Sequence, residues 1–491
     1  MTRHQPPTPA APRLEDSAAP TAPLRSPAPP TARRFTGSSI PSAARPAATA
    51  TNPPPTGPRP APSPDSGPEE APISTFAALR LRNYRLYFSG QIVSNSGTWM
   101  QRIAQDWLVL EITNSPLAVG ITTALQFLPM LLFGLFGGLL ADRYPKRRLL
   151  LLTQSVMGLL ALALAVLTLS GQIQVWHIYA VAFGLGLVTV VDNPTRQVFV
   201  NEMVPARLVR NAVSLNSGTF QIARMVGPAV AGVLISAVGS GWAFAINAAS
   251  FLATIGALLA MDAAQLQRIP RAAREKGQLR EGLRYVRARP HIMWLIVLVF
   301  FIGTFGYNFA IILSAYAKDV FHSNADVYGL LNTAMAVGSV IGALLAARRV
   351  TVRLSFLFAA AGGFSVMLVV LGAVPWLIPF TALLVLAGLL SITFNTTANA
   401  SIQLSTDAAV RGRVMSLYML VFMGGTPVGG PLVGAITDAW GAPVAIIICG
   451  VVCVIATAAC AALAARQAGI TLRVNLHRGV DRHLLLVHRQ G

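Results

Sequence analysis

The chain has 491 residues, of which 54% are hydrophobic and 11% carry a charge, and its formal net charge is +20. Soluble proteins carry a charge on about a quarter of their residues, so water cannot be the solvent for most of this chain. The positive charge does not indicate nucleic-acid binding, because the bases lie between apolar runs and form no basic face on a soluble domain. The three cysteines, Cys449, Cys453 and Cys460, share one apolar run, which is typical of buried thiols and excludes a disulfide framework.

Residues 1–73 contain most of the 33 prolines, separated by Ala, Ser and Thr. A segment of this composition cannot bury enough apolar surface to offset the entropy of ordering it. We therefore predict a disordered cytoplasmic tail.

From Tyr84 onward, apolar runs recur that are long enough to cross about 30 Å of hydrocarbon as α-helices. Helices are favoured because lipid offers no hydrogen-bond partner to open backbone groups. We predict an all-α membrane protein with twelve transmembrane helices, at 86–110, 117–141, 147–170, 175–195, 211–238, 242–261, 292–316, 327–347, 354–374, 376–397, 413–437 and 443–465.

Arginine and lysine are distributed asymmetrically among the links between these runs. Alternate links hold nearly all the bases, and the remaining links hold only Lys318. Since basic links stay in the cytoplasm, we predict that both termini are cytoplasmic, with a basic linker at 263–291 and a basic tail at 466–491.

The two halves of the helical region repeat at a constant offset. The aligned pairs are Gly186 and Gly388, Asn193 and Asn395, Gly227 and Gly429, Gly232 and Gly434, and Gly239 and Gly441. Parallel repeats of this kind are typical of transporters. They indicate an N-terminal six-helix bundle at 74–262 and a C-terminal one at 292–465.

Several stretches resemble the major facilitator superfamily. GGLLADRYPKRR resembles the loop between its helices 2 and 3, through Gly138, Asp142, Arg143, Lys146, Arg147 and Arg148, with Pro145 in place of a glycine. MVGPAVAG resembles, in shortened form, the helix 5 Gly-Pro element of drug:proton antiporters. NYRLYFSGQIVSNSGTWMQ, VDNPTRQ and NAVSLNSG resemble the bacterial export branch that includes enterobactin exporters and macrolide efflux proteins. The resemblance covers about 75–465 and implies two pseudo-symmetric bundles, but it does not give the substrate.

The resemblance implies a conformational latch. In the family the loop acid lies at the N-terminus of helix 11, where free N–H groups and the helix dipole favour an anion; the corresponding start here is 412–414. The loop arginines would pair with an acid at the cytoplasmic end of helix 4, which we assign to Asp192. These contacts would hold the outward-facing state. A topological role for the loop bases alone is the alternative.

The helix 5 element comprises Gly227, Pro228 and Gly232. The resemblance implies that it seals the bundle against proton leak. An ordinary proline kink is the alternative.

Polar residues recur at steps of three and four along the first predicted helix. Such a stripe is costly against lipid, so we expect it to face a cavity or the other bundle. In the resembling family the seventh and tenth helices also line the central cavity. Our candidate lining residues are Asn95, Thr98, Gln101, Gln105, Tyr307, Asn308, Asn395 and Asn399. Each could instead hold neighbouring helices together.

Three charged residues, Arg102, Asp106 and Arg224, lie well inside the predicted membrane region. We interpret Asp106 as an acid that binds and releases a proton, with either arginine as its partner when substrate is absent. A permanent structural pair is the alternative.

The sequence contains no G-x-x-x-x-G-K-[ST] motif, catalytic set or metal-ligand cluster, so we expect neither an enzyme nor a cofactor or metal. We predict a secondary transporter of the bacterial cytoplasmic (inner) membrane that exports amphipathic drugs, antibiotics or siderophores in exchange for protons. Its expected partners are the small-molecule substrate, protons and the lipid bilayer, with no nucleic acid. A nutrient importer or facilitator of the same fold, and a non-transporting membrane sensor or scaffold, remain as alternatives.

Overall fold

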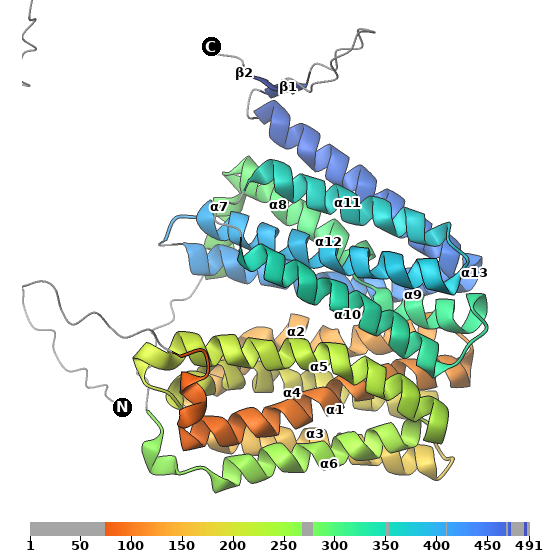
Figure 1. Cartoon of the computed structure of the whole chain (residues 1–491). Coiled ribbons are helices and arrows are strands. Elements are labelled where there is room, and N and C mark those ends of the chain that lie inside the picture. Colours follow the sequence, from red (N-terminus) through yellow and green to blue (C-terminus); the bar gives the residue numbers. More distant parts are fainter. Residues whose placement is uncertain are drawn as a thin grey trace, which may run out of the picture. The chain divides into compact units, whose positions relative to one another are not determined.

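The computed structural model describes residues 74–267, 278–348, 353–408, 410–467, 470–472 and 486–488. The predicted tail at 1–73 and parts of the predicted linker and C-terminal tail lie outside these residues. The described chain is almost wholly helical (Figure 1). Its α-helices are α1 Arg82–Thr113, α2 Pro116–Arg143, α3 Lys146–Leu169, α4 Val175–Glu202, α5 Val209–Val238, α6 Ser240–Ala260, α7 Gln278–Arg287, α8 Pro290–Phe301, α9 Phe309–Ala315, α10 Ala325–Ala347, α11 Leu354–Gly372, α12 Leu377–Leu404 and α13 Arg411–Gln467.

Shorter elements connect or follow these helices. They are the 3-10 turns Ala77–Arg80, Ala206–Leu208 and Ala263–Gln265, the π-helical stretches Ile302–Gly306 and Tyr316–Val320, and the strands β1 Ile470–Leu472 and β2 Leu486–His488. The two strands pair antiparallel, with Ile470 opposite His488.

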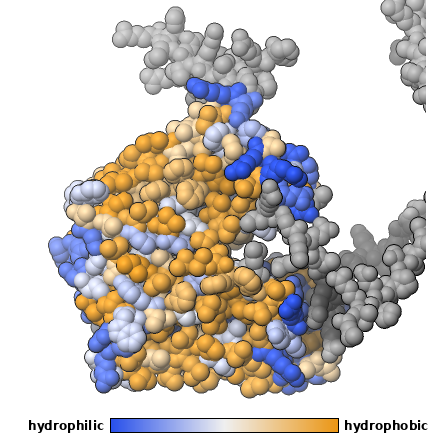
Figure 2. Space-filling view, turned by 180° about the vertical axis from the view of Figure 1, so that it is seen from behind, coloured by the Kyte–Doolittle hydropathy of each residue, from blue (hydrophilic) through white to orange (hydrophobic). Residues whose placement is uncertain are grey.

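Ten helical segments of the described chain are long and apolar enough to cross a membrane. α1 is not among them, because polar side chains recur along it. α13 counts as one segment, although its backbone leaves the helical region at Gly441. Figure 2 shows apolar residues over most of one face and hydrophilic residues gathered at its edges, which suits a surface that faces lipid between two aqueous sides.

The helices fall into two groups. In Figure 1, α1 to α6 (red to green) lie together, and α8 to α13 (green to blue) lie together. We call these the N-terminal and the C-terminal group. We call the end of the helices that carries the α2–α3 link at 144–145 the basic end, and the end that carries the α1–α2 link at 114–115 the far end.

Glycines allow close helix packing in both groups. A Cβ atom at Gly137 would overlap the carbonyl oxygen of Val190, where α2 crosses α4. A Cβ atom at Gly338 would likewise overlap the carbonyl oxygen of Val385, where α10 crosses α12. Small residues let helix backbones approach in this way inside a membrane.

The sequence repeat extends to backbone conformation at the far end. Gly239 joins α5 to α6 with φ 88° and ψ 165°, and Gly441 interrupts α13 with φ 78° and ψ 162°. Glycine adopts a positive φ at little cost. The two halves therefore reverse the chain at aligned residues and with the same geometry.

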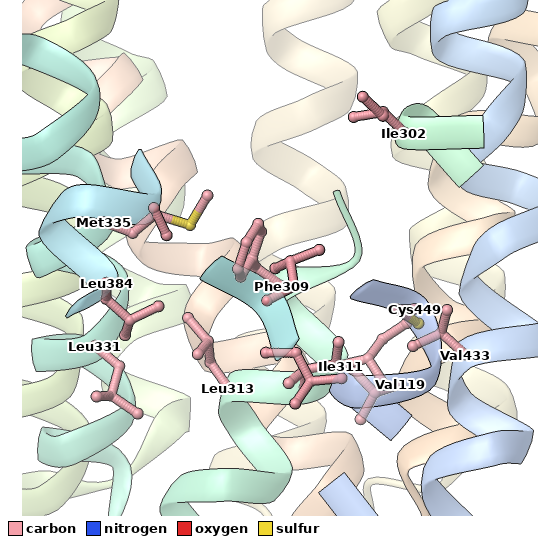
Figure 3. Packing of buried hydrophobic residues seen from close by; sticks show 14 of the residues in the cluster. Val119, Ile302, Phe309, Ile311, Leu313, Leu331, Met335, Leu384, Val433 and Cys449 are labelled. Carbon is pink, nitrogen blue, oxygen red and sulfur yellow. The ribbon is translucent and has the colours of Figure 1, made fainter. Parts of the chain in front are cut away.

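An apolar cluster crosses between the groups. Figure 3 shows Val119 of α2 near residues of the C-terminal group, among them Ile311 and Val433. The three cysteines are free thiols and are buried, as their apolar run predicts.

Replacing Gly137 by alanine should destabilise the fold, because its methyl group would meet a backbone carbonyl that cannot move aside. Overpacking of this kind costs about 1–3 kcal/mol, so we expect a lower thermal midpoint of the detergent-purified protein. Gly134→Ala is the matched control on the same helix, since its Cβ would meet only the Met130 side chain, at 3.7 Å. Equal midpoints for the two variants would contradict the packing described for α2 and α4.

Candidate functional site

The two groups approach most closely through glycines at the far end. A Cβ atom at Gly329 of α10 would lie 2.5 Å from the carbonyl oxygen of Pro228 on α5. A Cβ atom at Gly120 of α2 would overlap the carbonyl oxygen of Gly430 on α13, which aligns with Pro228 in the repeat. Gly232 also faces this contact, with its Cβ position 2.9 Å from the carbonyl oxygen of Ala325.

The helix 5 element therefore packs against two neighbours. Pro228 and Gly232 lie at the contact with α10, and Gly227 lies against α1, where a Cβ atom would be 2.5 Å from that of Trp99. The element belongs to the surfaces on which α5 meets both α1 and the other group.

Polar contacts reinforce this closure at the far end. The Lys318 ammonium donates to the carbonyl oxygen of Leu110 at 2.9 Å. Asp438 of α13 accepts from the Ser115 hydroxyl at 2.7 Å and from the Leu117 amide at 3.3 Å. Its carboxylate thus lies at the N-terminus of α2, where the helix dipole favours an anion.

Asp106 also joins the two groups near the far end. It is only 6% exposed and accepts a hydrogen bond from the Tyr328 hydroxyl of α10 at 3.2 Å. The Tyr328 ring stacks on Trp107, with centroids 6.2 Å apart. The expected partners Arg102 and Arg224 make no hydrogen bond or ion pair with Asp106. Within the described residues, every hydrogen bond that links the groups lies near the far end.

At the basic end, residues of the predicted latch bind within the N-terminal group. Lys146 pairs with Glu202 at 3.5 Å, and Arg147 donates to the carbonyl oxygens of Leu258 and Leu259 at 2.7 and 3.0 Å. Gly138, Asp142 and Arg143 lie in the last two turns of α2, and Arg148 lies in the first turn of α3.

The contact expected between Asp142 and the start of α13 is not formed in this conformation. Asp142 makes no hydrogen bond or ion pair with any residue that the structure describes. The acid beside the start of α13 is Glu281 of α7, which pairs with Arg413. Gly282 packs on the same turn, with its Cβ position 3.1 Å from the Arg413 carbonyl oxygen.

The position predicted for Asp192 is wrong. The predicted run ends at 195, but α4 continues to Glu202, so Asp192 lies ten residues, or about 15 Å, from that end. The acid at the end of α4 is Glu202. Arg196 likewise lies outside the predicted run although it belongs to α4. Asp192 precedes Arg196 by four residues, which is the spacing of an ion pair on one face of a helix. That spacing could have identified the two residues as a pair inside α4.

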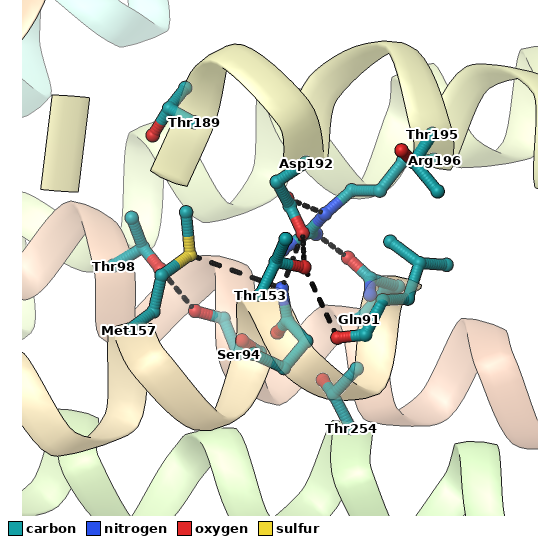
Figure 4. Close-up of polar contacts among 12 residues, drawn as sticks. Gln91, Ser94, Thr98, Thr153, Met157, Thr189, Asp192, Thr195, Arg196 and Thr254 are labelled. Carbon is teal, nitrogen blue, oxygen red and sulfur yellow. Dashed lines mark hydrogen bonds and ion pairs between the residues drawn. The ribbon is translucent and has the colours of Figure 1, made fainter. Parts of the chain in front are cut away.

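Asp192 belongs to a buried polar cluster of α1, α3 and α4 (Figure 4). Its side chain pairs with Arg196 and accepts from the Thr153 hydroxyl at 2.7 Å and the Gln154 amide at 2.8 Å. Arg196 also donates to the Gln91 side-chain oxygen. Asp192 is 2% exposed, so these contacts replace the water that its charge would otherwise require.

A cavity of about 830 Å³ lies next to this cluster. Residues of α1, α4 and α5 supply most of its wall, and Met423 of α13 is its one lining residue from the C-terminal group among the described residues. The lining extends along α4 to Asn201 and includes Val213 near the start of α5, so it runs toward the basic end.

The predicted lining residues divide between the two groups. Asn95, Thr98, Gln101 and Gln105 of α1 line the cavity, as does Arg102. The candidates of the C-terminal group do not.

Those candidates instead contact one another or the backbone. The Tyr307 hydroxyl donates to the Ser391 carbonyl oxygen at 3.2 Å, and Asn395 lies within hydrogen-bonding reach of Tyr307. Asn308 donates to the carbonyl oxygen one turn before it, and Asn399 accepts from Gln403.

Aromatic rings surround the cationic part of the cavity. The Arg102 guanidinium carbon lies 5.0 Å from the Trp99 ring centroid and 5.9 Å from that of Phe127. Arg224 approaches Trp99 at 5.9 Å. The described residues include no group of three His, Cys, Asp or Glu side chains that could hold a metal ion.

Residues 73–476 match the family model described as transmembrane secretion effector. The chain is 26% identical to the staphyloferrin A transporter of Staphylococcus aureus over 73% of its own length and 90% of that protein. It is 24% identical to the enterobactin exporter EntS of Escherichia coli O1:K1, over 72% of its length and 85% of that protein.

Solved structures show the same fold at lower identity. A bacterial homologue of the human lysosomal transporter Spinster, inward-facing and unoccupied, superposes with a TM-score of 0.63 at 14% identity. The match covers 78% of this chain and 97% of that one.

Removing the Arg196 charge should leave Asp192 as an uncompensated buried anion, a change that costs about 3–5 kcal/mol when one partner of a buried pair is lost. We therefore expect Arg196→Met to lower the thermal midpoint of the purified protein. The double variant Arg196→Met/Asp192→Asn removes both charges and should recover part of that loss. If the double variant is less stable than Arg196→Met, the pair is not the electrostatic unit described here.

Proposed function

Because the chain belongs to the transmembrane secretion effector family of the major facilitator superfamily, we propose that it is a secondary active transporter that exports amphipathic organic compounds in exchange for protons. The observation that carries this proposal is a cavity of about 830 Å³, whose wall combines amide side chains with aromatic and apolar ones, beside a closed far end. Siderophores are the substrate class that the relatives favour, since one is named for staphyloferrin A and another for enterobactin.

In this proposal the chain crosses the membrane twelve times. α1 adds a crossing because its polar stripe faces the cavity and the other helices, and α13 supplies two crossings on either side of Gly441. The crossings form two six-helix bundles, at 74–262 and 292–465. The basic end is cytoplasmic, because it carries the positive links.

Transport follows from alternating access between the two bundles. The far-end contacts of Asp438, Lys318 and the paired glycines hold the outer side closed in the present conformation. The cavity lining runs toward the basic end, so the present conformation would be the inward-facing one. The free Asp142 supports this reading, because its latch belongs to the outward-facing state.

Proton coupling would act through Asp106. As an anion, Asp106 accepts a charge-assisted hydrogen bond from Tyr328, and such bonds are roughly twice as strong as neutral ones. A proton on Asp106 would weaken this link between the bundles and favour opening of the far end. Binding of a proton from outside would then favour the outward-facing state, which is the state that releases substrate.

Efflux from proteoliposomes under an imposed pH gradient tests the proposal. We expect the wild type to export at least one member of a panel of siderophores, macrolides and lipophilic cations, and to do so faster with the gradient. Asp106→Asn should lose the response to the gradient because its side chain cannot exchange a proton. Glu111→Gln, an exposed acid on the same helix, is the control. If efflux by Asp106→Asn responds to the gradient as wild-type efflux does, Asp106 is excluded as the proton-coupling residue. Uptake of substrate driven by the gradient, instead of efflux, would favour an importer.

Asp142→Asn tests the latch. The variant should insert and fold, because Asp142 makes no hydrogen bond or ion pair with the described residues in this conformation. It should transport more slowly than the wild type, since the outward-facing state would lose its anion at the start of α13. If Asp142→Asn transports at the wild-type rate in vesicles, the loop has no latch function and serves only to set the membrane topology.

A further inference from the structure

The cavity face of α1 presents hydrogen-bond donors without acceptors. Gln101 and Gln105 are 3% and 1% exposed and both line the cavity. The side-chain nitrogen of each finds no partner among the described residues. The Gln101 oxygen already accepts from Asn247. Buried donors in this condition are costly unless a ligand or water supplies an acceptor.

Arg102, the residue after Gln101, adds a positive charge to the same cavity wall. Trp99 and Phe127 flank its guanidinium group, and aromatic faces orient a guanidinium without neutralising it. Arg102 makes no ion pair or hydrogen bond with any described residue, and Asp106, one turn away, is bound by Tyr328. The five N–H donors of Arg102 are therefore available to a ligand.

No other lining charge balances Arg102. The acid on the described wall is Asp192, and it is already paired with Arg196. Arg224, which approaches the Trp99 ring at 5.9 Å, has the same sign as Arg102. The wall is thus net positive and rich in donors, so it disfavours a cation and favours an oxyanion.

We propose that this face of α1 binds the oxyanion group of an organic anion, a carboxylate or a phosphate ester. Arg102 forms the ion pair, with its planar fork matched to two oxygens of such a group. Gln101 and Gln105 donate to the remaining oxygens. Trp99, Phe127 and Met423 contact an aromatic or apolar body. This inference rests on the proposed function in that it names the substrate class of the same cavity, and it excludes lipophilic cations from it.

Calorimetric titration of the full-length protein in detergent tests the inference without any transport step. The probes share a naphthalene body and differ in one group, namely naphthoate, naphthyl phosphate, methyl naphthoate and naphthyl-trimethylammonium. We expect naphthoate or naphthyl phosphate to bind the wild type at least about tenfold more tightly than the ester, as a charged hydrogen bond implies. The tighter of the two anions identifies the source of the oxyanion.

Arg102→Gln should reduce this preference to about one while ester binding persists, which also shows that the cavity remains folded. Arg102→Lys should keep part of the preference. Arg210→Gln, which removes an exposed charge at the start of α5, should leave the preference unchanged.

Three results would overturn the inference. They are equal binding of the anions and the ester by the wild type, a preference that survives Arg102→Gln, and tighter binding of the ammonium probe. The proposed export function is judged separately by proteoliposome efflux. If the protein exports neutral or cationic compounds and Arg102→Gln does not affect that export, only this inference is contradicted. If anions bind in an Arg102-dependent way but no compound is exported, only the export proposal is contradicted.

Discussion

Lipid cannot satisfy polar side chains, and this constraint determines where α1 lies. Its amides, Arg102 and Asp106 must be enclosed, so α1 packs on α5 and α6 and turns its polar face to the cavity and the other group. Asp106 reaches Tyr328 across the gap. Gln101 and Gln105 line the cavity, and their side-chain nitrogens have no partner among the described residues. One helix therefore carries both residues that line the cavity and a residue that is hydrogen-bonded to the opposite group.

Glycine positions govern how the two groups meet. In the contacts of α5 with α10 and of α13 with α2, Pro228 and Gly430, which align in the repeat, each meet a glycine of the other group, Gly329 and Gly120 respectively. Backbone meets backbone there, so the closure has a defined geometry. The polar contacts are less symmetric: Asp438 binds the start of α2, and its counterpart Ser236 accepts from the amide of Asp326 at the start of α10. An acid in one half and a hydroxyl in the other make the two contacts unequal in charge.

The sequence predicts much of the fold and about half of the site. Hydropathy locates the long helices, and the glycine repeat anticipates the matched turns at Gly239 and Gly441. Four residues of the predicted α1 stripe, Asn95, Thr98, Gln101 and Gln105, line the cavity in the structure, because periodicity indicates which positions share a face. Hydropathy ends the fourth helix too early, at 195, because the Arg196 charge reads as part of a link when it is counted alone. In the structure Arg196 pairs with Asp192 inside α4. Hydropathy also gives no sign that Lys318 would bind a carbonyl oxygen of α1, because that contact depends on tertiary packing. Tyr307 and Asn308 are polar residues that the sequence suggests as cavity lining, but in the structure their side chains donate hydrogen bonds to nearby carbonyl oxygens.

The single-residue reversals at Gly239 and Gly441 have a mechanical consequence. A connection of one residue allows the two helices that it joins little independent movement. A rotation of α5 therefore also moves α6, and a rotation of the first part of α13 also moves the second. α6 and the second part of α13 are thereby coupled to the helices that meet at the far end. A spectroscopic label on an exposed residue of α6 would therefore report a separation of the two groups at the far end.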